Sequence, residues 1–156
     1  MFEASAAGQD DRVAELLRAD PEQVNAFAPD GFQPLGLAAF FGKAAAARHL
    51  LENGADPNTP SRNGLKVQPL NSAVAGQNLE IARLLLEHGA DAIARQGEDF
   101  APLHGAAQNG QAAMIDLLLA YGADPRVKAA NGKSPLDYAQ VGNHSAAVER
   151  LIQALS

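Results

Sequence analysis

The segment APLHGAA, residues 101–107, decides the fold, because close variants of it occur three more times in the chain. These variants are QPLGLAA at 33–39, QPLNSAV at 68–74 and SPLDYAQ at 134–140. Their prolines recur at steps of 35, 33 and 33 residues, at Pro34, Pro69, Pro102 and Pro135. Proline suits the first turn of a helix, where its missing N–H leaves no hydrogen bond unmade. Each segment therefore predicts the start of a short helix.

A second series of segments has nearly the same spacing. The segments LLENGAD, LLEHGAD and LLAYGAD end at Asp56, Asp91 and Asp124. The glycine in each predicts the left-handed end of a second helix. Two independent markers with one period indicate an internal repeat, in which every repeat contributes a pair of helices.

Superimposing the second helices gives apolar columns that run through the whole chain. The columns are Leu16, Leu50, Leu85, Leu118 and Leu151; Leu17, Leu51, Leu86, Leu119 and Ile152; and Val13, Ala47, Ala82, Ile115 and Val148. One helix pair cannot bury its own apolar face, so stacked pairs need such columns. We therefore expect these positions to form a continuous core.

The period, the PLH.AA element of Pro102 to Ala107 and the LLEHGAD segment resemble the ankyrin repeat, and the resemblance covers nearly all of the chain. It implies an all-α repeat solenoid of stacked helix-turn-helix units, each with an outward β-turn finger. The expected single domain, 1–156, then has about five repeats: an N-terminal cap at 1–24, full repeats at 25–57, 58–92 and 93–125, and a C-terminal cap at 126–156.

The chain departs from the family pattern at the helix caps and in the fingers. The family prefers Thr at a cap position that holds Gln33, Gln68, Ala101 and Ser134 here. Only Ser134 is a strong N-cap, and each missing cap should cost about 1 kcal/mol. The finger glycine is replaced by Asp99 in the third full repeat, and two extra residues lie between Gly64 and Pro69. Both fingers should therefore have shapes of their own.

Composition argues against several classes of partner. The net charge is −6 with scattered basic residues, so we expect no nucleic acid and no anionic membrane as partner. The chain has no cysteine, no apolar run long enough to span a bilayer and no N-terminal signal pattern, so we expect a soluble, cytoplasmic protein.

No set of residues predicts catalysis, a metal site or a cofactor. Neither a nucleophile elbow nor a phosphate-binding glycine motif occurs. The histidines do not converge by spacing, and the resemblance makes His104 a structural residue. One aspartate per repeat, at Asp56, Asp91 and Asp124, is interpreted as a turn former, because equal slots in a solenoid lie too far apart to share a metal. We expect a protein that is not an enzyme.

The resemblance implies that a protein partner binds on the concave side, through finger tips and the late positions of the first helices. The corresponding residues are Phe27, Asp30, Phe32, Phe40 and Phe41; Arg62, Asn63, Leu65 and Lys66; Arg95, Glu98, Phe100, Gln108 and Asn109; and Lys128 and Lys133. Five of the six phenylalanines are among them, and four of these lie within residues 27–41. Aromatic residues anchor protein interfaces, and the basic members favour a partner with an apolar knob and an acidic flank.

Two sets of alternatives stay open at this point. Phe40 and Phe41 either reach solvent as part of a binding surface or lie flat over Ala6, Ala7, Ala75 and Gly76 as ordinary packing. The leading function is a non-catalytic protein-interaction module, expected to be a monomer. The alternatives are an inhibitor or immunity protein that blocks one enzyme, and a structural component that forms a homodimer through its phenylalanines.

Overall fold

A computed structural model describes all residues, 1–156, and contains ten α-helices and two short 3-10 helices. No strand forms beyond one isolated bridge between Gln96 and Phe100. The chain divides into two compact bodies, an N-terminal body, Met1–Ala90, and a C-terminal body, Asp91–Ser156. None of the helices is both long and apolar enough to span a bilayer.

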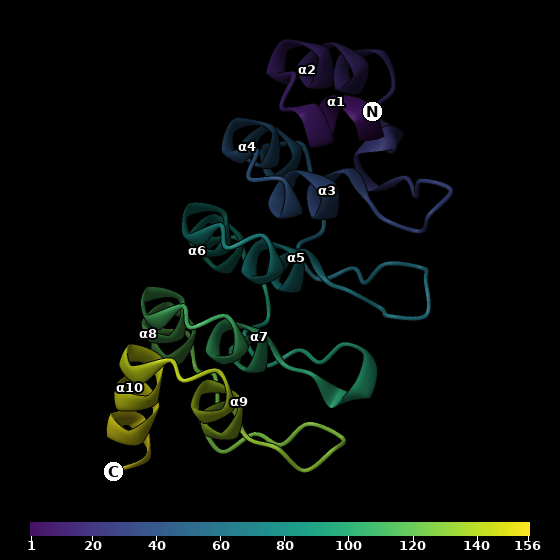
Figure 1. Ribbon diagram of the computed structural model, residues 1–156. Helices are drawn as coiled ribbons and strands as arrows, with labels where there is room; N and C mark the ends of the chain where they lie inside the picture. Colours follow the sequence, from purple (N-terminus) through teal and green to yellow (C-terminus); the bar gives the residue numbers. More distant parts are fainter. The chain divides into compact units, whose positions relative to one another are not determined.

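The N-terminal body consists of three helix pairs in two rows (Figure 1). The helices are α1 (Phe2–Ala7), α2 (Asp10–Ala19), α3 (Pro34–Phe40), α4 (Ala44–Glu52), α5 (Pro69–Ala75) and α6 (Leu79–Glu87), with the 3-10 helix η1 (Pro21–Asn25) after α2. Helix α3 packs between α1 and α5 in the first row, and α4 contacts α2 and α6 in the second.

The C-terminal body repeats this arrangement with two helix pairs. It contains η2 (Gly97–Asp99), α7 (Pro102–Gln108), α8 (Ala112–Ala120), α9 (Pro135–Val141) and α10 (Ser145–Leu155). Helix α7 packs against α9, and α8 packs against α10. Each of the five expected repeats thus contains one helix pair, and the boundaries between the repeats stay a prediction.

The helix ends form where the sequence predicts them. A proline begins α3, α5, α7 and α9. Gly54, Gly89 and Gly122, just beyond the second helices, have φ angles of 89°, 87° and 92°, which only glycine adopts without strain. Among the four cap positions, only Ser134 caps its helix with its side chain, by accepting a hydrogen bond from the N–H of Asp137. These expectations are confirmed.

Most positions of the apolar columns are buried, although several are not. Leu50, Leu85, Leu118 and Leu151 are fully buried. The prediction was wrong for Ile152, which is 52% exposed, and Leu16, Leu119 and Val148 are only partly buried. Ile152 is exposed because no helix packs over the far side of α9 and α10, whereas Leu151 on the same helix is buried.

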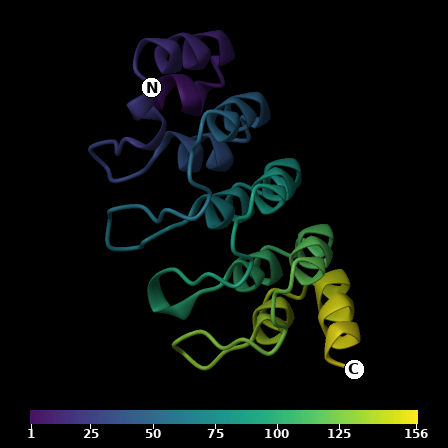
Figure 2. The same ribbon diagram turned by 180° about the vertical axis from the view of Figure 1, so that it is seen from behind.

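A finger precedes the first helix of four of the pairs, and Figure 2 shows the fingers from behind. The first (26–33) and second (58–68) belong to the N-terminal body, and the third (91–101) and fourth (124–134) to the C-terminal body. In the third finger Glu98 and Asp99 both have positive φ angles, of 62° and 55°, and in the second Lys66 has a φ of 50°. The expectation that these two fingers have their own shapes is confirmed.

Candidate functional site

The C-terminal end of α3 presents two aromatic rings to solvent. Phe40 is the last residue of α3 and Phe41 is its C-cap. They are 48% and 52% exposed, and their rings meet edge to face with centroids 5.1 Å apart. Both rings therefore reach solvent, and because their planes are 89° apart they cannot both lie flat over one surface. We call them the Phe40–Phe41 pair.

The neighbouring repeat holds the backbone beneath this pair. The side-chain amide of Asn78, just before α6, donates hydrogen bonds to the carbonyl oxygens of Ala39 (2.7 Å) and Phe40 (3.0 Å). A Cβ atom on Gly76 would collide with the carbonyl oxygen of Phe40. Gly76 therefore makes room for the backbone of α3, whereas the sequence analysis considered it as room for an aromatic ring.

The first and second fingers contact each other through Phe27 and Arg62. The guanidinium carbon of Arg62 lies 3.8 Å from the centroid of the Phe27 ring. The backbone N–H of Arg62 donates to the carbonyl oxygen of Gly31 at 2.8 Å. Two predicted contact residues thus bind each other, and the contact holds the two fingers together.

The remaining predicted residues of these fingers divide into turn formers and exposed side chains. Asp30 and Asn63 each accept a hydrogen bond from the N–H two residues later, as turn-forming residues do. Phe32 is half-buried, whereas Lys66 is exposed and Leu65 is 63% exposed.

In the C-terminal body, the predicted basic residues are largely engaged. Arg95 donates to the carbonyl oxygen of Lys128 at 3.2 Å, and Lys128 lies 3.9 Å from the carboxylate of Asp137. The ammonium group of Lys133 lies 5.8 Å from the ring centroid of Tyr138. The third and fourth fingers are also joined by a bond from the N–H of Ala130 to the carbonyl oxygen of Glu98.

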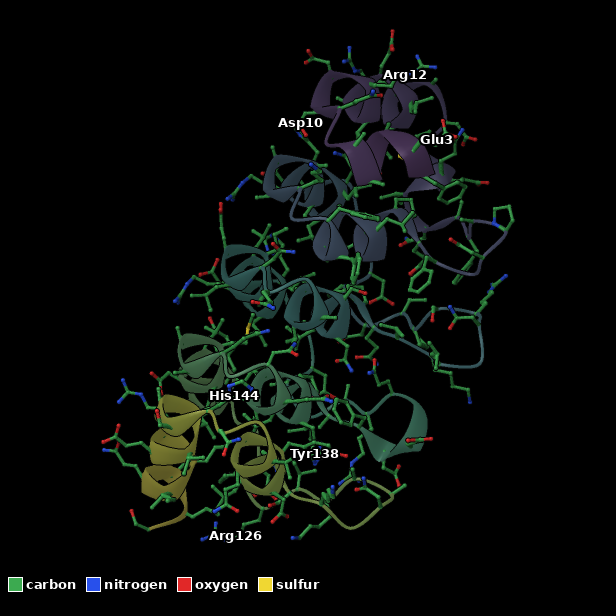
Figure 3. The ribbon with its side chains drawn as sticks, viewed as in Figure 1. Glu3, Asp10, Arg12, Arg126, Tyr138 and His144 are labelled. Carbon is green, nitrogen blue, oxygen red and sulfur yellow. The ribbon has the colours of Figure 1, made fainter.

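Phe100 belongs to an aromatic cluster with His104 and Tyr138. The Phe100 ring stacks on His104 at 5.2 Å and meets Tyr138 edge to face at 5.5 Å. Tyr138, labelled on α9 in Figure 3, accepts a hydrogen bond at its hydroxyl from Asn131. Phe100 is half-buried by these contacts. Its main role in the structure is therefore to pack the third finger onto α7 and α9.

His104 is fully buried, as expected of a structural residue. Its Nδ1 accepts a hydrogen bond from the N–H of Ala101 at 3.0 Å, whereas its Nε2 is buried without a well-formed bond. Burial lowers the pKa of His104 below its ordinary value of 6.5, although the nearby carbonyl groups of Lys133 and Val127 act in the opposite direction. The neutral imidazole is therefore the form that the fold favours.

Gln108 and Asn109, at the end of α7, are exposed. The carbonyl oxygen of Gln108 lies 2.9 Å from Nε2 of His144, the residue before α10 that Figure 3 labels. His144 thus contacts the end of α7 as Asn78 contacts the end of α3. This relationship escaped the sequence analysis. Its signal was a series of polar residues with the repeat period just before the second helices: Lys43, Asn78, Gln111 and His144.

The Phe27–Arg62 contact was also missed, although both residues were named as contact residues. They lie on the fingers of neighbouring repeats, Phe27 four residues before Gly31 and Arg62 two residues before Gly64. An aromatic residue and an arginine just before these two finger glycines could have indicated the contact, because both side chains are long enough to bridge adjacent repeats.

The histidines and acidic residues do not gather into a metal centre. No group of three or more His, Asp or Glu side chains gathers where it could hold a metal ion. Asp56, Asp91 and Asp124 each accept a bond from the backbone N–H two residues later, which confirms that they form turns. A pocket beside Ile93 and Leu103 has a volume of about 180 Å³. That volume is below the range of pockets that hold drug-sized ligands.

Comparison with known protein families agrees with the stacked helix pairs. Residues 1–96 match a family model described as ankyrin repeats (3 copies), and residues 87–139 match one described as ankyrin repeats (many copies). The chain belongs to the ankyrin repeat family. It is thus an all-α repeat solenoid built of helix pairs.

Two human proteins share ankyrin-like sequence with the chain. One is neurogenic locus notch homolog protein 4, which is 46% identical over 69 residues, 44% of this chain and 3% of that protein. The other is BCL-6 corepressor-like protein 1, which is 36% identical over 88 residues, 56% of this chain and 5% of that protein. The chain therefore spans a small fraction of the length of these relatives. Ankyrin repeats are in general protein-binding, non-catalytic units.

Proposed function

We propose that the chain is a non-catalytic module that binds one protein partner through the finger side of its N-terminal body. By the family resemblance this is the concave side. The observation that carries the proposal is the exposure of the Phe40–Phe41 pair, with about half of each residue open to solvent. Exposed adjacent aromatic residues are unusual on a soluble surface, and aromatic side chains anchor protein interfaces more than most others.

The surroundings of the pair suit a binding surface. The backbone beneath it is held by Asn78, so its rings are presented from an ordered helix end and binding costs less conformational entropy. Exposed Leu65 adds apolar area on the second finger, and Arg62 and Lys66 add positive charge there. A partner with an apolar side chain flanked by acidic residues would complement this surface.

Affinity capture from the source cell tests the proposal. The wild-type chain is compared with Phe40→Ser and Phe41→Ser, which change exposed side chains and should leave the fold intact. Tyr121→Ser is the matched control, because Tyr121 is also an exposed aromatic residue but lies after α8, a helix of the second row. We expect both phenylalanine variants to lose a partner that the wild type and Tyr121→Ser retain.

Retention of the same partner by all four proteins at equal yield would show that the aromatic proposal is wrong. Light scattering at micromolar concentration accompanies the capture. A dimer that dissociates in Phe41→Ser would point to self-association in place of a separate partner. If the captured partner is an enzyme that loses activity in the complex, the module acts as an inhibitor.

A further inference from the structure

We propose that Arg62, held on the ring of Phe27, binds the carboxylate of an acidic side chain in the protein partner. This inference rests on the proposed function and names the chemistry that the two fingers of the N-terminal body recognise. It concerns the first and second fingers, and its residues are distinct from the Phe40–Phe41 pair.

The guanidinium group of Arg62 is ordered before any partner arrives. It stacks on Phe27 at 3.8 Å, and its own backbone is tied to Gly31 by a 2.8 Å hydrogen bond. The two fingers are so close that a Cβ on Gly31 would lie 2.9 Å from the backbone nitrogen of Asn63. The ring therefore supports one face of the guanidinium group from a neighbouring finger whose backbone is in direct contact.

The donors of Arg62 are nevertheless unused. Five of the eight arginines bond to a carboxylate or a carbonyl oxygen through their side chains: Arg12, Arg18, Arg95, Arg126 and Arg150. The guanidinium groups of Arg48, Arg62 and Arg83 make no hydrogen bond and no ion pair, and among these three only Arg62 stacks on a ring. An arginine that is positioned but unpaired, in a chain of net charge −6, is suited to an acid from outside the chain.

The geometry favours a carboxylate as the occupant. Stacking covers a face of the planar group and leaves its N–H edges open, and two parallel N–H groups match the two oxygens of a carboxylate. The neighbouring acid, Asp30, already uses one carboxylate oxygen to accept the N–H of Phe32 at 3.1 Å. A phosphate group is bound in proteins by clusters of arginines, whereas the finger offers one. Exposed Leu65 on the same finger would contact an apolar neighbour of the acid.

The test follows the side-chain Nε–Hε resonances of the arginines by NMR in the intact protein. Sodium acetate is titrated at constant ionic strength against sodium chloride, and inorganic phosphate is titrated in a parallel series. We expect acetate to shift the Arg62 resonance downfield with saturation, and the resonance of Arg83, an exposed and unstacked arginine of the same body, to move little. In Phe27→Leu the guanidinium group is no longer held before acetate binds, so the apparent affinity of Arg62 for acetate should fall by up to about two- to fivefold, the value of an exposed cation–π contact.

Equal responses of Arg62 and Arg83 to acetate would overturn the inference, as would saturation of Arg62 by phosphate alone. The comparison of the two arginines within the wild-type protein decides the matter even if Phe27→Leu folds poorly. A silent Arg62 together with capture that depends on Phe40 would reject this inference and leave the proposed function standing. A responsive Arg62 with capture indifferent to Phe40 and Phe41 would do the reverse.

Discussion

The side chain of Asn78 donates a hydrogen bond to the backbone carbonyl oxygen of Phe40 across 38 residues of sequence, at 3.0 Å. Its second bond, to Ala39, satisfies another carbonyl at the end of α3, where no further turn of helix supplies a donor. One repeat thereby fixes the helix end on which the preceding repeat's aromatic residues are displayed. The stability of the fold and the display of the Phe40–Phe41 pair are therefore coupled at this point.

Replacing this amide should loosen the end of α3. We expect Asn78→Ala to lower the free energy of unfolding by about 1 to 2 kcal/mol, because two carbonyl groups lose a donor. Urea denaturation measures this loss, and faster amide hydrogen exchange at residues 40–43 shows its location. Asn53→Ala is the control, since the side chain of Asn53 donates only to the carbonyl oxygen of His49 in the preceding helix. Unchanged exchange at 40–43 in Asn78→Ala would contradict the coupling.

Gly76 and Gly64 provide a matched pair of glycines for the same region. An added Cβ at Gly76 meets the backbone of Phe40, which cannot move aside without shifting α3, whereas Gly64 has nothing within 4 Å. We expect Gly76→Ala to destabilise the protein by about 1 to 3 kcal/mol, as overpacking usually does. Gly64→Ala should be nearly neutral. Equal urea midpoints for the two variants would show that α3 and α5 are not so closely packed.

His104 should make stability depend on pH in the weakly acidic range. Its pKa is lowered in the folded state by burial, so the unfolded chain binds the proton more tightly. Its contribution to stability is thus fully present above the ordinary value of 6.5 and is lost as the pH falls below it toward the lowered folded-state pKa. The urea midpoint, measured from pH 8 to 5, should decrease in that window.

In His104→Gln the part of the fall in urea midpoint that comes from protonating His104 should disappear. The variant should also be less stable than the wild type at pH 8. His49→Gln, which leaves the buried histidine intact, should keep the wild-type pH dependence. A wild-type midpoint that does not change between pH 7 and 5 would argue against a neutral buried imidazole.

The central columns of the core should respond strongly to truncation. Leu85 and Leu118 are fully buried, and we expect Leu85→Ala and Leu118→Ala each to cost about 2 to 5 kcal/mol. Ile152→Ala should cost much less, because half of that residue is already exposed and little apolar contact is lost. Urea unfolding curves of the three variants test this order. A loss at Ile152 as large as that at Leu85 would mean that Ile152 is covered in solution.

We expect glycine at position 99 of the third finger to make the protein more stable than Asp99 does. Asp99 occupies the finger position that is Gly31 or Gly132 in other repeats, and its φ of 55° lies in the left-handed region. A left-handed backbone conformation at a non-glycine residue lowers the stability of the folded state by at least about 1 kcal/mol. Asp99→Gly should therefore raise the melting temperature slightly, as calorimetry would show. A lower melting temperature would indicate that the Asp99 side chain makes a stabilising contact.

The fold could be predicted from the sequence because its determinants are local and repeated. These determinants are a proline at the start of each first helix, a glycine after each second helix and an aspartate in each turn. Each acts on backbone only a few residues away, so its effect can be predicted from the sequence. The turn roles of Asp56, Asp91 and Asp124 and the cap at Ser134 were predicted for this reason. The prediction failed at Ile152, because burial there depends on whether another helix pair covers it.

The candidate surface was only partly open to prediction. The repeat register named Phe40, Phe41, Phe27 and Arg62 as contact residues, since equal positions in repeats have equal surroundings. The repeat register does not predict which of these side chains contact one another. Phe100 became part of a cluster with His104 and Tyr138, and Arg62 stacked on Phe27, because these contacts depend on side-chain reach between repeats.

The sequence by itself determined the repeat, the helix pairs and the family, because each of these depends on residues that act locally and recur with one period. Only the tertiary structure decided that the Phe40–Phe41 pair is exposed. That outcome depends on Gly76, whose lack of a Cβ leaves room for the backbone of Phe40, and on Asn78, whose side chain donates to the carbonyl oxygen of Phe40. Both residues lie more than thirty positions away in the sequence, and they meet α3 only when two repeats pack together.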